Sequence, residues 1–294
     1  MDLDFSVIIP TYRRPTELEA CLRALARQDF PLDRFEVIVS DDGGGGLEVL
    51  RDFTAHSLPQ CTFVTQPRSG PASARNLGAG NARGRFLAFT DDDCEPSPVW
   101  LSALSLVLEA QPDALVGGST VNTIRSNRYA AASQQLIDFL YIAYADRRAE
   151  RFFTSNNFAV SSRMFASLDG FDVTFRLPAG EDRDFCSRWA ALGRALIYSP
   201  SARVYHSHSL TFRRFWKQHL RYGQGAYQLR KRMRETGRPA LHVQPPGFYL
   251  RMISYPFKNG VGNPGERLAI AILLVLSQVA NLCGFAREAL RWSR

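Results

Sequence analysis

The sequence predicts an α/β fold in which helices flank a mostly parallel, doubly wound sheet, followed by a C-terminal helical extension. Short apolar or β-branched segments alternate with helical patterns over the first 90 residues, and turn chemistry or a helix follows each segment. Beyond residue 210 the chain changes to one basic and one uncharged helical stretch. A chain of 294 residues is long enough for such a domain and its appendage.

The predicted strands are short and apolar, as strands buried on both faces of a sheet are. They cover residues 5–10, 36–40, 62–65, 86–90 and 115–118. Between the first two, Thr16 and Glu19 have the spacing of a capping box, which predicts the start of an amphipathic helix. Further helices are predicted near residues 128–145 and from Glu181 onward.

The last third of the chain contains two helical patterns of different character. Residues 211–235 are basic, and Gly223 and Gly225 predict an interruption there. Residues 268–286 hold no charged side chain, and 19 residues is borderline for crossing a bilayer. Four polar residues fall on one side of a helical wheel: Ser277, Gln278, Asn281 and Glu288. We therefore expect an amphipathic helix that docks on the body or lies in the membrane interface, with a membrane span as the alternative.

Charge and cysteine content restrict the partners and the compartment. The net charge is +8, and eight cations fall between Arg213 and Arg234, which indicates an anionic partner. No nucleic-acid module is recognisable, so we expect a membrane surface or a polyanionic acceptor and no nucleic acid. The five cysteines are widely spread and suggest neither disulfides nor a zinc site. The N-terminus has no secretory pattern, which predicts a cytoplasmic location, with peripheral contact at the inner face of the plasma membrane.

Three polar segments follow the predicted strands and would gather at the carboxyl edge of the sheet, where ligands of such sheets bind. They cover residues 10–13, 41–46 and 91–93. The triplet Asp91, Asp92 and Asp93 is costly for a fold unless a cation or a donor array neutralises it. Oxygen ligands favour Mg²⁺ or Mn²⁺. A solvated turn is the alternative for the triplet alone, and its convergence with the other two segments favours a functional site.

Other candidate residues follow from residue type and position. Asp41 or Asp42 can accept from a base or a ribose, and Arg75 near the start of a helix suits a diphosphate. On a helical wheel Asp182 lies on the apolar side of its helix, as a general base facing a site would, whereas Asp184 points away. His206 and His208 would share one side of an extended segment, and a metal role depends on the carboxylates being close.

An ordered set of motifs resembles the family 2 glycosyltransferases of the GT-A, Rossmann-like fold. The matching segments are VIIPTY at 7–12, EVIVSDDG at 36–43, ARNLG at 74–78, FTDDD at 89–93, DGFD at 169–172 and GEDRDF at 180–185. The resemblance covers about residues 5–225. It implies a transferase domain at 1–210, with a nucleotide-binding half at about 1–110 and an acceptor half at about 111–210, and an extension at 211–294.

The resemblance also implies a role for each matched residue. Pro10, Thr11 and Arg13 would line the nucleotide pocket, Asp41 or Asp42 would hold the base, and Arg75 would contact the nucleotide or its phosphates. Asp91 and Asp93 resemble the D-x-D pair, with Asp93 as the best metal ligand, Asp92 near the ribose and His206 completing the metal shell. Asp182 matches the catalytic base, and Asn156, Asn157 and Glu181 would lie near the donor sugar and the acceptor. The run Gly43 to Gly46 departs from the family pattern and predicts a more mobile loop.

The implied activity is a single inverting displacement, dependent on Mg²⁺ or Mn²⁺, from a nucleotide-diphosphate sugar to a hydroxyl of a glycan or lipid-linked acceptor. A UDP-sugar is favoured, and polysaccharide biosynthesis at the cell envelope is the expected setting. One alternative is a nucleotidyltransferase, which also gathers acids on such a sheet. Another is a non-catalytic basic adaptor that binds membrane or nucleic acid through residues 213–234.

Overall fold

The computed structural model of the protein describes residues 3–124, 126–175, 179–239, 243–260 and 262–292. The chain divides into two compact units. Unit 1 comprises residues 1–121 and 152–207, and unit 2 comprises residues 122–151 and 208–294. The structure thus groups residues 122–151 with the C-terminal helices. The boundary at residue 210, between a transferase domain and a C-terminal extension, stays a prediction from the sequence.

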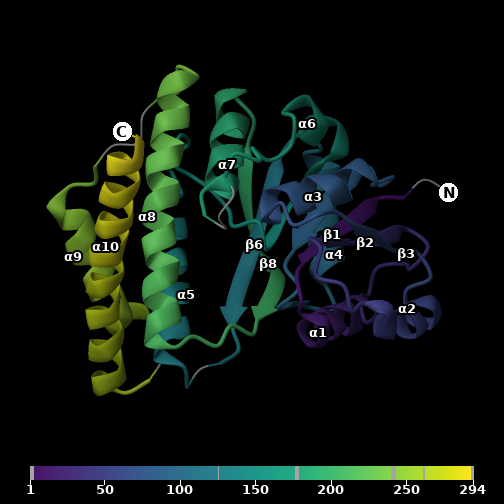
Figure 1. Cartoon of the computed structure of the whole chain (residues 1–294), viewed down its shortest axis with the longest axis horizontal. Coiled ribbons are helices and arrows are strands. Elements are labelled where there is room, and N and C mark those ends of the chain that lie inside the picture. Colours follow the sequence, from purple (N-terminus) through teal and green to yellow (C-terminus); the bar gives the residue numbers. More distant parts are fainter. Residues whose placement is uncertain (1–2, 125, 176–178, 240–242, 261, 293–294) are drawn as a thin grey trace. The chain divides into compact units, whose positions relative to one another are not determined.

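Unit 1 is an α/β unit whose strands and helices alternate in the N-terminal half (Figure 1). Its strands are β1 (Phe5–Thr11), β2 (Phe35–Asp41), β3 (Cys61–Thr65), β4 (Phe86–Thr90), β5 (Cys94–Pro96), β6 (Leu115–Asn122), β7 (Asn157–Ser161) and β8 (Leu196–His206). Its helices are α1 (Pro15–Leu25), the 3₁₀ turn η1 (Glu48–Leu50), α2 (Arg51–Ser57), α3 (Pro71–Gly80), α4 (Trp100–Ala110), α6 (Ser162–Ser167) and α7 (Glu181–Ala191). All five predicted strands are present.

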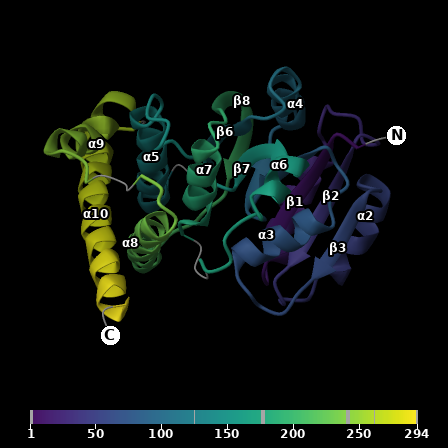
Figure 2. The same ribbon diagram turned by 90° about the horizontal axis from the view of Figure 1, so that it is seen from above.

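The strands of unit 1 form a mixed sheet of eight strands within the described residues, in the order β3-β2-β1-β4-β7-β6-β8-β5. The first four are parallel, with Thr11 paired to Asp41, so the ends of β1 and β2 lie side by side. Figure 2 shows β1, β2 and β3 together with α3 against them. β7 runs antiparallel to both β4 and β6, which ends the parallel part of the sheet. The predicted α/β class with helices flanking the sheet is confirmed.

The core of unit 1 forms because the central strands are apolar on both faces. β1, β2 and β4 are buried along nearly their whole length. Helices α1 and α4 bury Leu22, Trp100 and Leu104 against this sheet. The carboxyl ends of the parallel strands are therefore fixed by a rigid core, and the polar residues that follow them are held in place.

The predicted capping box at the start of α1 is wrong. Pro15 occupies the first turn of the helix, and Arg14 is the N-cap residue without a side-chain cap. Thr16 thus lies inside the helix rather than at its cap. Glu19 instead accepts two hydrogen bonds from Arg23 one turn later, at 2.7 and 3.0 Å.

Unit 2 is helical. Its helices are α5 (Arg128–Ala143), α8 (Phe212–Glu235), α9 (Pro246–Asn259) and α10 (Pro264–Trp292). Helix α8 is continuous from residue 212 to 235, so the predicted interruption at Gly223 and Gly225 is wrong. Gly223 serves packing instead, because a Cβ there would lie 1.9 Å from the Asn281 carbonyl oxygen of α10. Gly284 of α10 meets the Leu220 carbonyl in the same way, so the two helices lie backbone to backbone (Figure 1).

Candidate active site

The acid triplet lies at the carboxyl end of β4, next to the carboxyl end of β1. The Thr11 hydroxyl donates to Asp92 Oδ2 at 2.8 Å. The Arg14 guanidinium contacts both Asp92 and Asp93. It lies 3.1 Å from Asp92 Oδ1 and 2.8 Å from Asp93 Oδ2. A donor array therefore neutralises part of the triplet, as its charge density requires.

The triplet is electrostatically strained even with these donors. Burial raises the pKa of Asp92 to about 6, and the neighbouring Asp93 adds to the rise, whereas Arg14 and Thr11 oppose it. Asp93 is itself engaged on its other oxygen, since His206 Nε2 lies 3.2 Å from Asp93 Oδ1. Although burial of the ring lowers the pKa of His206, the Asp93 carboxylate outweighs it and the net shift is upward.

Asp93 and His206 form the core of a candidate metal centre. β5 pairs with β8 so that Cys94, directly after Asp93, lies opposite His206. Both side chains keep some contact with solvent, 12% for Asp93 and 23% for His206, and Asp91 keeps 31%. Two carboxylates and an imidazole are ligands that Mn²⁺ accepts, and Mg²⁺ would prefer the oxygen atoms alone. His208, the second histidine of the motif, begins the C-terminal segment of unit 2.

Arg75 joins the triplet to helix α7. Its guanidinium is 4% exposed and lies 2.7 Å from Asp91 Oδ1 and 3.2 Å from Glu181 Oε1. Asp42 fixes the helix that carries Arg75, because its carboxylate accepts from the backbone N–H of Ser69 and of Gly70 at the start of α3. The position of Arg75 is therefore set by the end of β2.

Helix α7 begins with two adjacent carboxyl groups in a low-dielectric setting. Burial raises the pKa of Glu181 to about 7, with Asp182 adding to the rise and Arg75 opposing it. Burial also raises the pKa of Asp182, while hydrogen bonds from the backbone N–H groups of Arg183 and Ser155 oppose it. Two adjacent carboxyls with raised pKa values are the kind of arrangement that general acid–base catalysis uses.

The predicted outward position of Asp184 is wrong. Asp184 is buried and pairs with Arg188 at 2.7 Å. The same guanidinium donates to the carbonyls of Leu168 and Gly170, so this ion pair joins α7 to the turn that follows α6. The helical wheel failed because it assigns charged residues to solvent and cannot anticipate a buried partner.

Asp41 and Asp42 both accept hydrogen bonds from the protein's own backbone. Asp41 accepts from the N–H groups of Gly44 and Gly45, at 2.8 and 2.9 Å. A side chain at residue 44 would lie 2.6 Å from the Arg13 backbone nitrogen, so glycine is required where this loop passes the end of β1. The glycine run is thus anchored at one end by Asp41.

The two predicted asparagines have different environments. Asn157 is fully buried and makes three bonds: Trp100 Nε1 donates to its oxygen, and its amide donates to the Ser119 and Ala202 carbonyls. Asn156 is held by Thr154, whose hydroxyl donates to its oxygen at 2.7 Å. The amide of Asn157 is therefore committed to the core, and Asn156 is the better candidate for contact with a sugar.

Sequence reasoning missed Arg14 and the aromatic contact of Arg68. Arg14 pairs with the triplet, although the sequence had indicated only its neighbour Arg13. Tyr12 lies beneath two guanidinium groups, with Arg68 4.6 Å and Arg13 5.2 Å from its ring centre. The sequence indicated these contacts only through the basic residues after the first strand. It does not show which of these arginines contacts the acid triplet.

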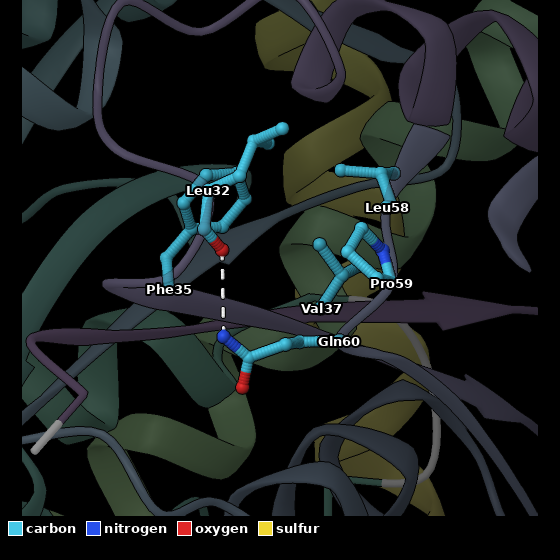
Figure 3. A pocket seen from close by; sticks show the side chains of 6 residues that line it. All are labelled: Leu32, Phe35, Val37, Leu58, Pro59 and Gln60. Atoms are coloured by element: carbon cyan, nitrogen blue, oxygen red, sulfur yellow. Dashed lines mark hydrogen bonds between the residues drawn. The ribbon is translucent and has the colours of Figure 1, made fainter. Parts of the chain in front are cut away.

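A small pocket lies elsewhere in unit 1 (Figure 3). It is lined by Leu32, Phe35, Val37, Leu58, Pro59 and Gln60, and the Gln60 amide donates to the Leu32 carbonyl at 3.4 Å. These residues lie where β2 and β3 begin, at the opposite end of the strands from the acids, and none of the six is ionisable. The pocket is therefore not the candidate active site.

An α/β unit with acids gathered at the carboxyl edge of its parallel strands is the arrangement of the GT-A fold, and solved structures agree. A Pyrobaculum calidifontis mannosyltransferase in complex with GDP-Man and Mn²⁺ superposes with a TM-score of 0.64 at 18% identity, covering 96% of this chain and 88% of that one. The S. aureus TarS fragment 1–349 in complex with UDP-GlcNAc gives 0.61 at 17% identity, covering 99% and 93%. At these identities the likeness shows the fold.

Sequence comparison gives the family. The family model for glycosyl transferase family 2 matches residues 6–169, and that for glycosyl transferase family group 2 matches residues 103–285. The chain belongs to glycosyltransferase family 2 and is an enzyme of that class. The glycosyltransferase AglE of Haloferax volcanii is 26% identical over 298 residues, which is 98% of this chain and 95% of AglE. The chain matches 16% to 66% of the length of other curated relatives.

Proposed function

We propose that the protein is a metal-dependent, inverting hexosyltransferase that moves a sugar from a nucleotide-diphosphate sugar to a hydroxyl of a glycan or lipid-linked acceptor. One observation carries the proposal: buried Arg75 bridges Asp91 of the triplet and Glu181, the neighbour of Asp182. A single side chain, Arg75, thereby connects the acids that would face the donor with the helix that would supply the base. This arrangement suits a displacement in which proton removal and departure of a leaving group occur in one site.

Asp182 would act as the base. Its raised pKa makes the ionised carboxylate a stronger base toward the proton of the acceptor hydroxyl. The acceptor oxygen then forms a bond to the anomeric carbon from the side opposite the nucleotide. The bond between that carbon and the diphosphate oxygen breaks, and the nucleoside diphosphate leaves with the electron pair. Attack from the opposite side inverts the configuration.

The donor would lie over the ends of β1, β2 and β4. Pro10, Thr11 and Arg13 would line its nucleotide, Asp41 or Asp42 would meet the base, and Asp92 would lie near the ribose. Arg75 would contact the phosphates. Asp41 and Asp42 each hold a backbone loop, so their role toward the base would be carried by oxygen lone pairs that the loops leave unused.

Asp93, Asp91 and His206 would hold the metal, which supplies charge neutralisation on the diphosphate. The imidazole in this set favours Mn²⁺ over Mg²⁺. Arg14 supplies positive charge to the same carboxylates at 2.8 and 3.1 Å. Arg14 would thus balance the triplet before a cation binds.

We propose UDP as the nucleotide of the donor. GDP and dTDP are the alternatives, and an assay with a panel of nucleotide sugars would distinguish the three. Two related folds bind different donors, UDP-GlcNAc in TarS and GDP-Man in the mannosyltransferase, so the fold itself admits both. We also propose a cytoplasmic enzyme that meets a lipid-linked or polysaccharide acceptor at the inner face of the membrane through unit 2.

The Asp182→Asn variant tests the proposal. A positioned base contributes about 10² to 10⁴ in rate, so kcat should fall by that factor while donor binding stays unchanged. The assay is metal-dependent release of nucleoside diphosphate across a panel of nucleotide sugars, with donor affinity measured by calorimetry. Asp184→Asn is the matched control on the same helix, and it should lower Tm with little change in kcat for the folded fraction. Full activity in Asp182→Asn would contradict the proposal that Asp182 is the catalytic base.

A further inference from the structure

Helix α10 buries polar residues together with apolar ones on its inward side. Two of its polar residues are fully enclosed there: Ser277 is 0% exposed and Glu288 is buried. The Glu288 carboxylate accepts from Gln224 Nε2 at 3.2 Å and from Gln228 Nε2 at 2.9 Å, both on α8. The polar side found in the sequence is therefore the side that packs on α8, and it is satisfied within unit 2.

The opposite side of α10 is an exposed aliphatic stripe. It consists of Leu268, Ile272, Val275, Val279, Leu282 and Leu290, whose exposed fractions run from 42% to 71%. At the rotation of an α-helix these residues fall within about 80° of one another. They extend along about 33 Å of the helix at its usual rise. A continuous apolar stripe of this length on a solvent-exposed surface indicates an interaction site.

The exposure of this stripe argues against a core helix, and the basic helix packed beside α10 argues against a membrane span. Helix α10 is long and apolar enough to cross a membrane, since an 18-residue window of it has a mean hydropathy of 2.2, but only 39% of that window is buried. Its backbone contacts that of α8 at Gly223 and Gly284. A spanning α10 would draw in α8, whose eight lysine and arginine side chains would have to enter hydrocarbon. Lying parallel to a surface requires no such burial.

The charge of the chain is divided between its two units. Unit 2 contains 20 Lys and Arg against 6 Asp and Glu, a net charge of +14. Unit 1 contains 16 against 22, a net charge of −6. The helical unit therefore carries the whole positive excess. It would repel a second copy of itself and attract an anionic surface.

Helix α9 repeats the combination of apolar and basic residues. Leu250 and Phe257, seven residues apart, share one side of the helix and are exposed. Arg251 and Lys258 each follow one of them and are also exposed. Aliphatic and aromatic side chains beside lysine and arginine are typical of helices that lie in the plane of a membrane interface.

We propose that the aliphatic stripe of α10 is a membrane-docking surface, which lies in the headgroup region of an anionic bilayer with the helix axis parallel to it. The stripe supplies apolar burial and the cations of unit 2 supply attraction to the lipid phosphates. The inference deepens the proposed function by naming the partner of unit 2. It does not depend on the chemistry at Asp182.

Sedimentation with vesicles tests the proposal on the full chain. Wild-type protein should sediment with phosphatidylcholine vesicles that contain about one third phosphatidylglycerol and less with phosphatidylcholine alone. The variant Ile272→Gln, Val279→Gln, Leu282→Gln should bind more weakly by roughly tenfold for each side chain. Arg251→Gln with Lys258→Gln should weaken binding by roughly fivefold for each charge at low salt only. The matched control is Val49→Gln with Leu106→Gln, two residues of unit 1 that are 75% and 74% exposed, and it should bind like wild type.

Cys283 offers a second readout at the edge of the stripe. Of the five cysteines, all within the described residues, Cys283 is the one that is exposed. An environment-sensitive dye on Cys283 should shift to the blue when anionic vesicles are added. Wild-type protein that stays in the supernatant, or a triple variant that sediments as wild type does, would overturn the proposal. The proposal would also be overturned if analytical ultracentrifugation showed that the wild-type protein is a dimer and that the triple variant is a monomer. Release of nucleoside diphosphate without vesicles should be equal in all these variants, which separates this result from the proposed function.

Discussion

At the scale of single residues, neighbouring side chains of one motif have different environments and different roles. Asp182 and Asp184 begin the same helix, yet one is a half-buried carboxyl with a raised pKa and the other is locked to Arg188. Arg13 and Arg14 are adjacent, yet Arg14 is the one that contacts the triplet. Burial and partners, rather than residue type, separate these roles.

Asn156 and Asn157 offer a direct test of this separation. Asn157→Ala would leave the Trp100 N–H and two carbonyls without a partner, so we expect a loss of roughly 2–4 kcal/mol in the free energy of unfolding. Asn156→Ala removes fewer hydrogen bonds, so it should cost less stability than Asn157→Ala, and it should raise KM for donor or acceptor. Urea denaturation and steady-state kinetics of both variants measure this. Unchanged stability in Asn157→Ala would show that its hydrogen bonds are not structural.

At the scale of elements, close contact between α8 and α10 depends on glycine. Gly223→Ala would place a Cβ 1.9 Å from the Asn281 carbonyl oxygen. We expect it to lower the free energy of unfolding by about 1–3 kcal/mol, although alanine favours a helix by up to about 1 kcal/mol. Gly80→Ala is the control, because a Cβ at the end of α3 meets nothing within 4 Å. Urea denaturation should show that the control is neutral or slightly stabilised. Equal stability of the two variants would contradict the packing.

Helix α8 also contains a buried histidine whose protonation opposes folding. Burial lowers the pKa of His219 from 6.5 to about 4, and its Nδ1 has no hydrogen-bond partner among the described residues. Between those two pH values the unfolded chain binds a proton that the folded chain does not. The stability contributed by neutral His219 is therefore full above pH 6.5 and is lost as the pH falls toward 4.

From pH 7 to pH 5 this loss should be about 2 kcal/mol. The free energy of unfolding of wild-type protein should fall by that amount more than that of His219→Gln, measured with urea at both pH values. His56→Gln, at an exposed histidine of unit 1, should behave as wild type. Parallel pH profiles for wild type and His219→Gln would refute the assignment.

At the scale of the whole molecule, donor and metal should stabilise the fold together. A ligand that binds only the folded chain at 100 times its Kd adds about 2.7 kcal/mol, so UDP with Mn²⁺ should raise Tm by roughly 5 °C or more. UDP alone should raise it less, because Asp93 and His206 would then lack their cation. Differential scanning fluorimetry with a nucleoside triphosphate as control measures this. A metal-independent response would argue against the proposed metal centre.

The sequence by itself determined the order of strands and helices in the parallel half, the acids at the ends of β2 and β4, and the family. These are local properties, because strand periodicity, turn chemistry and motif order are written in contiguous residues. Only the tertiary structure decided the mixed half of the sheet, the Arg75 bridge from Asp91 to Glu181, the burial of Asp184 and the inward polar face of α10. Each of these depends on a partner distant in the chain, and a helical wheel gives the faces of a helix without saying which face meets the protein.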